Sequence, residues 1–212
     1  MLNSLSFKLK IGLLVAVALV AVAILTVLST FQSRQQILDA RRDQLVTAVQ
    51  AAHGVVTGFQ AKARSGAMSE VDAKKAAAEA VGLSRYGGPD GKTEYFYIWT
   101  LDGAGVMHPL RTEWNGQNMI GKVKDGAGVD IILALMDGMK NSRDGKAFVP
   151  TNFPRPGSST PVPKLQYVIK VDGWNWMVGS GLYTDDVDAL VRRQMIGGAV
   201  ELLLALIIIG GI

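Results

Sequence analysis

The sequence contains no cysteine and only two histidines, His53 and His108. Without cysteine, the chain can form neither disulfide bonds nor a thiolate metal site. Two histidines exclude a histidine-rich metal site, and His53 lies outside the apolar stripe of its helical segment, which favours a surface position. The sequence therefore predicts no metal site.

Motifs typical of enzymes are also missing. The run Gly179-Ser180-Gly181 lacks the residue on each side of the serine that a nucleophile elbow requires. No glycine-rich turn is followed by Gly-Lys-Ser or Gly-Lys-Thr at the spacing of a phosphate loop. The net charge of +4 is small, so no nucleic-acid footprint is expected. We predict a protein without catalytic residues, without a cofactor and without a nucleic-acid partner.

Two long apolar runs lie near the ends of the chain. Residues 11–28 form eighteen positions without a charge, and residues 196–212 contain one charge in seventeen positions. Helices of this length cross, or nearly cross, a hydrocarbon layer of about 30 Å at a rise of about 1.5 Å per residue. We therefore predict membrane helices at 11–30 and 196–212. The second run ends while still apolar, which is expected of a truncated receptor.

The basic residues near the first run set its expected orientation. Lys8 and Lys10 favour a cytoplasmic position for residues 1–10, which sends the long segment 31–193 to the other side of the membrane. A cleaved signal peptide is the alternative, since Ala21-Val22-Ala23 is a small-residue triplet. This triplet lies inside the apolar run, however, and the run is longer than the usual signal core of about 7 to 15 residues.

Glu201 is the one charge in the second run. An ionisable group inside a membrane helix is a functional candidate by default. Alternatively, the span begins later and the side chain reaches the interface. The sequence leaves both interpretations open.

The segment between the runs predicts one α+β domain. Apolar side chains recur at helical spacing in residues 31–65, which indicates a long stalk helix. Residues 94–182 alternate short aromatic or β-branched runs with turn residues, which indicates an antiparallel sheet of about five strands crossed by one helix. Thr184, followed by two aspartates, is a good N-cap for a return helix over 184–195. The expected strands are 94–100, a short strand ending at 107, 146–149, 165–170 and 176–180, and the expected crossing helix is 130–139.

Aromatic residues and cations gather in the predicted sheet. By strand alternation, one face of strand 94–100 carries Tyr95, Tyr97 and Trp99, and the other face carries Phe96 and Ile98. One face can pack the core while the other lines a pocket. Arginine, lysine and tyrosine hydroxyls all suit the recognition of a carboxylate. The alternative, that these residues are core aromatics and ordinary surface charges, remains open at this point.

Seven short stretches occur in a characteristic order along the chain. They are Arg85-Tyr86, Glu94-Tyr95-Phe96-Tyr97-Ile98, Met107-His108-Pro109, Gly116 with Asn118, Asp125-Gly126-Ala127-Gly128, Pro163-Lys164-Leu165-Gln166-Tyr167-Val168, and the run from Trp174 to Asp186. Together, over roughly residues 34–190, they resemble the single Cache sensor family, in the branch that is common in methyl-accepting chemotaxis proteins.

The resemblance implies a PAS-like antiparallel sheet behind a long stalk helix. It also implies a pocket on one side of the sheet for a small carboxylate such as acetate, propionate, lactate or pyruvate. The positions that match this pocket are Arg85, Tyr95, Tyr97, His108 and Lys164, with Trp99 and Tyr167 beside them. Trp99 stands where family members usually carry a polar residue, and an inward Trp99 would favour ligands of two or three carbons.

The whole pattern predicts the ligand-binding and transmembrane part of a chemoreceptor. It would lie in the bacterial inner membrane with a periplasmic or extracellular sensor domain, pair as a homodimer through its stalks, and pass a helix shift to a cytoplasmic signalling module. The same ectodomain also precedes sensor histidine kinases and cyclic-nucleotide enzymes. A membrane-tethered extracytoplasmic enzyme is a different class, but the catalytic motifs that it requires are missing.

Overall fold

The structure, a computed structural model, describes residues 6–88 and 90–210. It divides into two compact units. The sheet unit comprises Arg41–Asp185, and the helix-pair unit comprises Met1–Ala40 with Asp186–Ile212.

The helix-pair unit contains the first part of α1 (Phe7–Arg64) and nearly all of α4 (Asp185–Gly210). An ion pair of 2.9 Å joins Arg34 to Asp188. Among the helices of the described residues, α1 alone has both the length and the apolar composition that are needed to cross a membrane. A second span at 196–212 therefore stays a prediction, and its last two residues lie outside the described part of the chain.

The sheet unit is built on a six-stranded antiparallel sheet, which confirms the predicted fold class. Its strand order is β1-β2-β6-β5-β4, and the short β3 pairs with β2. The strands are β1 (Arg85–Tyr86), β2 (Glu94–Thr100), β3 (Gly105–Met107), β4 (Lys146–Pro154), β5 (Pro161–Val171) and β6 (Trp176–Tyr183). The strand that leads into α4, β6, is therefore at the centre of the sheet.

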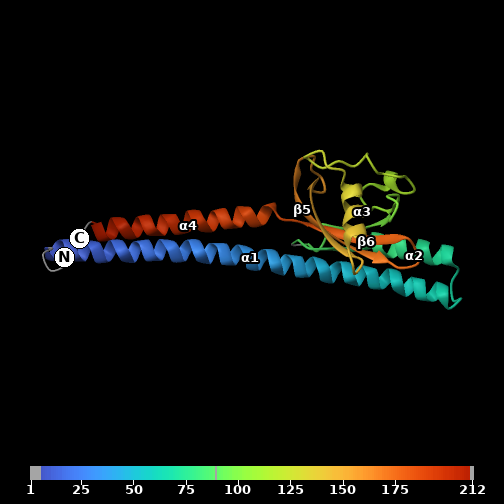
Figure 1. Cartoon of the computed structure of the whole chain (residues 1–212), viewed down its shortest axis with the longest axis horizontal. Coiled ribbons are helices and arrows are strands. Elements are labelled where there is room, and N and C mark those ends of the chain that lie inside the picture. The colour runs from blue at the N-terminus through green and yellow to red at the C-terminus, as the bar shows by residue number, and fades with distance from the viewer. Residues whose placement is uncertain (1–5, 89, 211–212) are drawn as a thin grey trace. The chain divides into compact units, whose positions relative to one another are not determined.

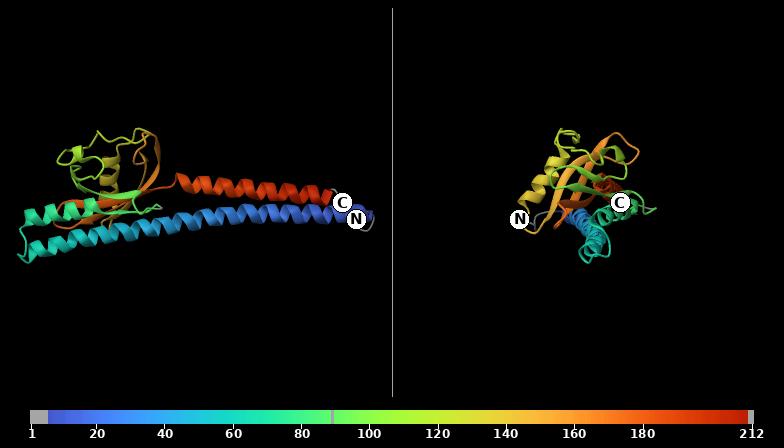
Figure 2. Two further views of the ribbon diagram at one scale, coloured as in Figure 1. Left: turned by 180° about the vertical axis from the view of Figure 1, so that it is seen from behind. Right: turned by 90° about the vertical axis from the view of Figure 1, so that its right-hand side faces the viewer.

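Helices cover both faces of this sheet (Figures 1 and 2). On one face, α2 (Glu70–Leu83) and residues 41–64 of α1 pack against Phe96 and Ile98. On the other face, α3 (Ile131–Asn141) packs against Tyr95, Tyr97 and Trp99. The alternation predicted for β2 is confirmed, and each face has its own apolar cluster.

Side-chain caps hold the two short helices. Ser69 accepts a hydrogen bond from the Asp72 amide and begins α2. Asp130 accepts hydrogen bonds from the amides of Ile132 and Leu133 and begins α3. Because these caps satisfy amides that have no partner within the helix, they fix where each helix starts on the sheet.

The hairpin of β4 and β5 is longer than the sequence predicted. The ladder continues to the pair Pro154 and Pro161, beyond the strands expected at 146–149 and 165–170. Proline is rare inside sheets because it has no amide hydrogen to donate to a neighbouring strand. An edge strand tolerates proline because one of its sides has no neighbouring strand. Here β4 is an edge strand, and β5 pairs with β6 only from Lys164 onward. The proline-rich end of the hairpin is therefore a ribbon of two strands.

Candidate functional site

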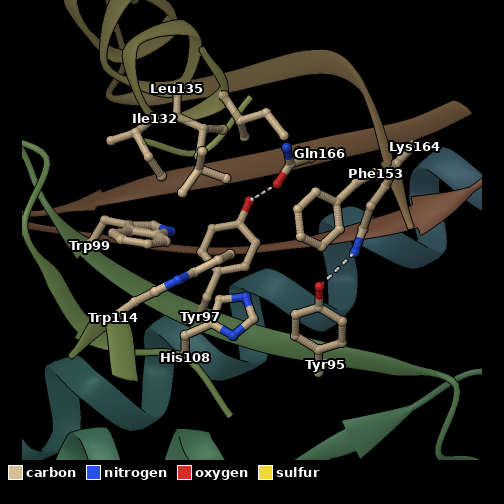
Figure 3. Close-up of a pocket in the computed structure, with 12 residues that line it drawn as sticks. Tyr95, Tyr97, Trp99, His108, Trp114, Ile132, Leu135, Phe153, Lys164 and Gln166 are labelled. Atoms are coloured by element: carbon tan, nitrogen blue, oxygen red, sulfur yellow. Dashed lines mark hydrogen bonds between the residues drawn. The ribbon is translucent and has the colours of Figure 1, made fainter. Parts of the chain in front are cut away.

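A small cavity of about 20 Å³ lies between α3 and the sheet (Figure 3). A volume of this size holds about one water molecule. Three strands and α3 contribute to its wall. The lining residues are Tyr95, Tyr97, Trp99, His108, Trp114, Val123, Ile131, Ile132, Leu135, Phe153, Lys164 and Gln166. The wall combines one cation with several aromatic rings and a few polar groups.

Lys164 on β5 is the cation of this wall, and its side chain is buried. Its Nζ donates to the hydroxyl oxygens of Tyr95 at 3.2 Å and Tyr183 at 3.3 Å. The Tyr183 hydroxyl in turn donates to the Pro154 carbonyl at 2.7 Å. An ammonium group has three hydrogens, so one remains for a ligand. Burial lowers the pKa of Lys164 to about 8, against the opposing effect of the Glu94 carboxylate.

His108 contributes a neutral ring. Its Nδ1 accepts a hydrogen bond from the Leu110 amide at 3.3 Å, so the ring hydrogen is on Nε2. Burial lowers the pKa of His108 to about 3, and the Lys164 cation lowers it further. The ring stacks on Tyr97 at 6.4 Å and meets the edge of Tyr95 at 5.2 Å. At neutral pH this side chain is a hydrogen-bond donor without charge.

A chain of hydrogen bonds holds the Tyr97 hydroxyl, which points toward Gln166 in Figure 3. Tyr97 donates to Gln166 Oε1 at 2.7 Å. Gln166 Nε2 donates to Thr151 Oγ1 at 3.0 Å, and Thr151 donates to the Lys164 carbonyl at 3.2 Å. These groups are all buried. Because buried polar groups are costly when unpaired, this chain fixes the orientation of each member.

The opposite end of the cavity is apolar. Ile131, Ile132 and Leu135 come from α3, where their spacing places them on the face that meets the sheet. Trp99 and Trp114 complete this end, with ring centroids 6.2 Å apart. Trp99 therefore points inward. An apolar end of this kind accepts a short alkyl group and excludes charge.

Two glycines on β6 make room for the polar side chains. A Cβ atom on Gly179 would lie 2.6 Å from Cε2 of Tyr97, and a Cβ atom on Gly181 would lie 2.6 Å from Cε of Lys164. Both positions face the cavity side of the sheet, opposite Ser180, which is buried on the other side. Glycine at these positions lets Tyr97 and Lys164 lie flat across the central strand.

We expect Gly179→Ala to lower the free energy of unfolding by about 1–3 kcal/mol, because the added methyl group overpacks the core. Gly54→Ala is the matched control, since Gly54 has no atom within 4 Å of the added methyl group. It is expected to raise the free energy of unfolding by about 0.5–1 kcal/mol, the usual gain for alanine over glycine inside a helix. Chemical denaturation of both variants measures the difference. Equal stability of Gly179→Ala and wild type would contradict the close packing of Tyr97 on β6.

A wider opening of about 440 Å³ adjoins the cavity and shares Tyr95, His108 and Phe153 with it. Four cations line this opening: Arg111, Lys122, Lys124 and Arg155. Arg155 also pairs with Asp185, the first residue of α4. A mouth of one charge sign raises the local concentration of ligands of the opposite sign. The opening is therefore suited to the entry of anions.

The structure brings together five of the seven site residues predicted from the sequence: Tyr95, Tyr97, Trp99, His108 and Lys164. Arg85 does not line the cavity. Its guanidinium donates to the carbonyls of Gly82 and Ser84. Tyr167 lies on the other face of the sheet and packs on Phe148 at 4.5 Å.

Three cavity residues, Gln166, Trp114 and Phe153, are not among the site residues predicted from the sequence. Gln166 had a usable signal, because it stands two positions after Lys164 on the same strand and must face the same side. Trp114 is the last residue of a three-residue 3-10 helix (Thr112–Trp114), and Phe153 lies in the proline-rich end of the hairpin, so neither position has a periodic signal.

Comparisons with known protein families, sequences and solved structures agree with one another. The sequence profile of the family described as Single Cache domain 2 matches residues 37–196. The methyl-accepting chemotaxis protein McpP of Pseudomonas putida is 29% identical over 214 residues, which covers 98% of this chain and 38% of that receptor. The chain therefore spans less than half the length of this relative.

Two solved structures share the fold. One is the periplasmic sensor domain of a chemotaxis protein, with a TM-score of 0.62 and 38% identity over 70% of this chain and 98% of that one. The other is a Cache chemosensory domain studied for carboxylic acid recognition, with a TM-score of 0.64 and 29% identity over 71% of this chain and 98% of that one. Both similarities cover nearly all of the solved domain.

Proposed function

Because this chain belongs to the single Cache domain 2 family, we propose that its sheet unit binds a short carboxylate in the cavity beside Lys164. The chain is a Cache sensor domain of the chemoreceptor type. One observation supports a carboxylate as the ligand. Three residues with a hydrogen to donate, Lys164, Tyr95 and His108, line the cavity.

The three donors suit a carboxylate for separate reasons. Lys164 supplies a positive charge and one remaining hydrogen. Tyr95 accepts the bond from Lys164, so its own hydrogen is available. His108 presents its Nε2 hydrogen and adds no charge. Two carboxylate oxygens offer about four acceptor sites, which is enough for all three donors.

The size of the cavity favours a ligand of two or three carbons. Its volume of about 20 Å³ is small, and its far end is closed by the side chains of α3 and two tryptophans. Acetate, propionate, lactate and pyruvate combine one carboxylate with a short alkyl end, and the surrounding walls must move slightly to admit them. The related Cache domain described as recognising carboxylic acids supports this class.

The proposed response begins at Lys164. When the ligand neutralises this buried charge, the Lys164 ammonium is drawn toward the carboxylate and its bond to Tyr183 changes. Tyr183 is the last residue of β6, and Asp185 begins α4. We infer that a small displacement of α4 then carries the signal. A ligand must favour one state by about 1–3 kcal/mol to shift such an equilibrium usefully.

The membrane arrangement is part of the same proposal. Residues 1–10 would be cytoplasmic, 11–30 and 196–212 would cross the inner membrane, and 31–193 would be the extracytoplasmic sensor domain. The apolar first part of α1 and the periplasmic origin of one solved relative support this arrangement. We further propose a homodimer, an absence of enzymatic activity in this segment, and a cytoplasmic signalling module of the chemotaxis type.

A thermal-shift screen of the whole chain in detergent tests the ligand class. At a ligand concentration about 100-fold above Kd, binding stabilises a protein by about 2.7 kcal/mol, so the unfolding temperature should rise by several degrees. We expect a rise with acetate, propionate, lactate or pyruvate. Arg85→Ala and Tyr167→Phe should keep this rise, because both side chains lie outside the cavity. A folded chain that responds to none of these acids would refute the proposed ligand class.

A further inference from the structure

The hydrogen of the Tyr97 hydroxyl is already committed to the protein. Its nearest partner is Gln166 Oε1 at 2.7 Å, and the Ser180 carbonyl lies at 3.5 Å. A distance of 3.5 Å is too long for a strong hydrogen bond, so Gln166 is the acceptor that holds the hydrogen. A phenol has a single hydrogen. Toward the cavity, Tyr97 therefore offers only the lone pairs of its oxygen.

The orientation of the Gln166 amide follows from its second partner. Thr151 uses its one hydroxyl hydrogen to donate to the Lys164 carbonyl, so Thr151 Oγ1 accepts from Gln166. The group of Gln166 that faces Thr151 must then be the NH₂ group, and the group that faces Tyr97 must be the carbonyl oxygen. This series of hydrogen bonds makes the Tyr97 hydroxyl oxygen an acceptor for any ligand.

The other polar groups of the cavity have the opposite character. Lys164, Tyr95 and His108 each have a hydrogen left to donate. The cavity thus has donors from Lys164, Tyr95 and His108, and the Tyr97 oxygen is an acceptor in the same wall. The ring of Tyr97 stacks on His108 at 6.4 Å, and its hydroxyl points toward Gln166 (Figure 3). A carboxylate satisfies the donors, and a neighbouring hydroxyl would satisfy the acceptor.

We propose that Tyr97 makes this site select 2-hydroxy carboxylates over 2-oxo carboxylates of the same length. This inference rests on the proposed binding of short carboxylates. A hydroxyl on the carbon next to the carboxylate can donate to the Tyr97 oxygen. A keto oxygen at the same position places two acceptors together, which costs affinity because neither is satisfied after water has left. A ligand with only a methylene group there gains nothing from Tyr97.

The test uses three acids of equal length: lactate in both enantiomers, pyruvate and propionate. Isothermal titration calorimetry of the whole chain in detergent measures each Kd. We expect the tighter lactate enantiomer to bind about 10-fold more strongly than pyruvate. Lactate gains a buried hydrogen bond to the Tyr97 oxygen, whereas pyruvate leaves that oxygen without a partner. In Tyr97→Phe this ratio should fall to about 2-fold or less, while propionate affinity stays within about 2-fold of wild type.

Further variants keep the test decisive. Tyr167→Phe removes a hydroxyl of the same kind on the other face of the sheet and should keep the wild-type preference. If Tyr97→Phe does not fold, Gln166→Leu takes its place. This variant removes the nearest acceptor for the Tyr97 hydrogen, so the hydrogen can turn to a keto oxygen and pyruvate should gain on lactate.

The possible results separate the two proposals. No preference for lactate in wild type, or a preference that survives in Tyr97→Phe, would overturn the role of Tyr97 and leave carboxylate binding intact. An unchanged ratio in Gln166→Leu would overturn it as well. If none of the three acids binds to the folded wild-type chain, the proposed function itself fails, and the selectivity inference fails with it.

Discussion

The Lys164→Met variant is expected to bind short carboxylates about 100-fold more weakly than the wild-type chain, because removing one partner of a buried charge pair costs several kcal/mol. Among the described residues that line the cavity, Lys164 alone carries a positive charge. Its hydrogen-bond partners, Tyr95 and Tyr183, are neutral phenols, and the Glu94 carboxylate also acts on its charge. Methionine keeps most of the volume of the side chain, which limits the effect on packing. Calorimetric titration with acetate and propionate measures the loss.

Two controls separate lost binding from lost folding. Lys164→Met relieves the desolvation of a buried cation but also removes a charge that acts on the buried Glu94 carboxylate, so the circular-dichroism spectrum of the unliganded variant must show that it folds. Arg85→Ala removes a cation that bonds the end of α2 instead, and it should retain wild-type affinity. If Arg85→Ala lost affinity while Lys164→Met kept it, the ligand would have to bind outside the cavity described above.

The affinity for carboxylates is expected to be constant from pH 6 to about pH 7.5 and to fall above pH 8. Lys164 loses its proton in the unliganded protein near its pKa of about 8. A bound carboxylate favours the ammonium form, so the proton that has been lost must be regained on binding. The affinity then falls to about one thirtieth of its neutral value by pH 9.5. Calorimetry across this range measures the decline.

The other titratable groups of the cavity do not change their protonation between pH 6 and pH 9.5. Burial holds the pKa of His108 at about 3, so its ring stays neutral throughout. Burial also raises the pKa values of Tyr95 and Tyr97, so both hydroxyls stay protonated. The decline in affinity is therefore assigned to Lys164. An affinity that stays constant to pH 10 would show that the ammonium group does not contact the ligand.

The pH dependence of the stability of the unliganded protein provides an independent measurement of the protonation of Lys164. The pKa of Lys164 is lower in the folded state than in the unfolded state, whose value is about 10.4. Above pH 8 the unfolded state therefore binds more protons, and the free energy of unfolding rises as pH increases toward about 10.5. Lys164→Met should lack this rise. Stability and affinity should thus change in opposite directions over one pH range.

Strand alternation explains how much of the site the sequence could predict. In β2 the rule placed Tyr95, Tyr97 and Trp99 on one face, and the structure confirms it. Applied to β5, the same rule separates Lys164 from Tyr167, because they are three positions apart and face opposite sides. The family resemblance named both residues, and only the pleat of the strand distinguishes the one that lines the cavity.

Arg85 shows where a pattern of residues is insufficient. It follows directly after α2, whose last carbonyl groups have no partner within the helix. A cation near this end is favoured by the helix dipole, and the guanidinium donates to Gly82 and Ser84 there. The sequence shows that an arginine is present between α2 and β2. It does not show which of two possible acceptors, a helix end or a ligand, the side chain binds.

The position of β6 in the sheet has a mechanical consequence. This strand is hydrogen bonded on both sides, to β2 and to β5, so it cannot slide without breaking two ladders. Only Thr184 separates its last residue from α4, and the Thr184 amide is itself bonded to the Pro163 carbonyl. A single residue reaches at most about 3.6 Å, which leaves little slack to absorb movement. If α4 carries the signal as proposed, this short link would pass a displacement of β6 at the cavity to the start of the helix with little loss.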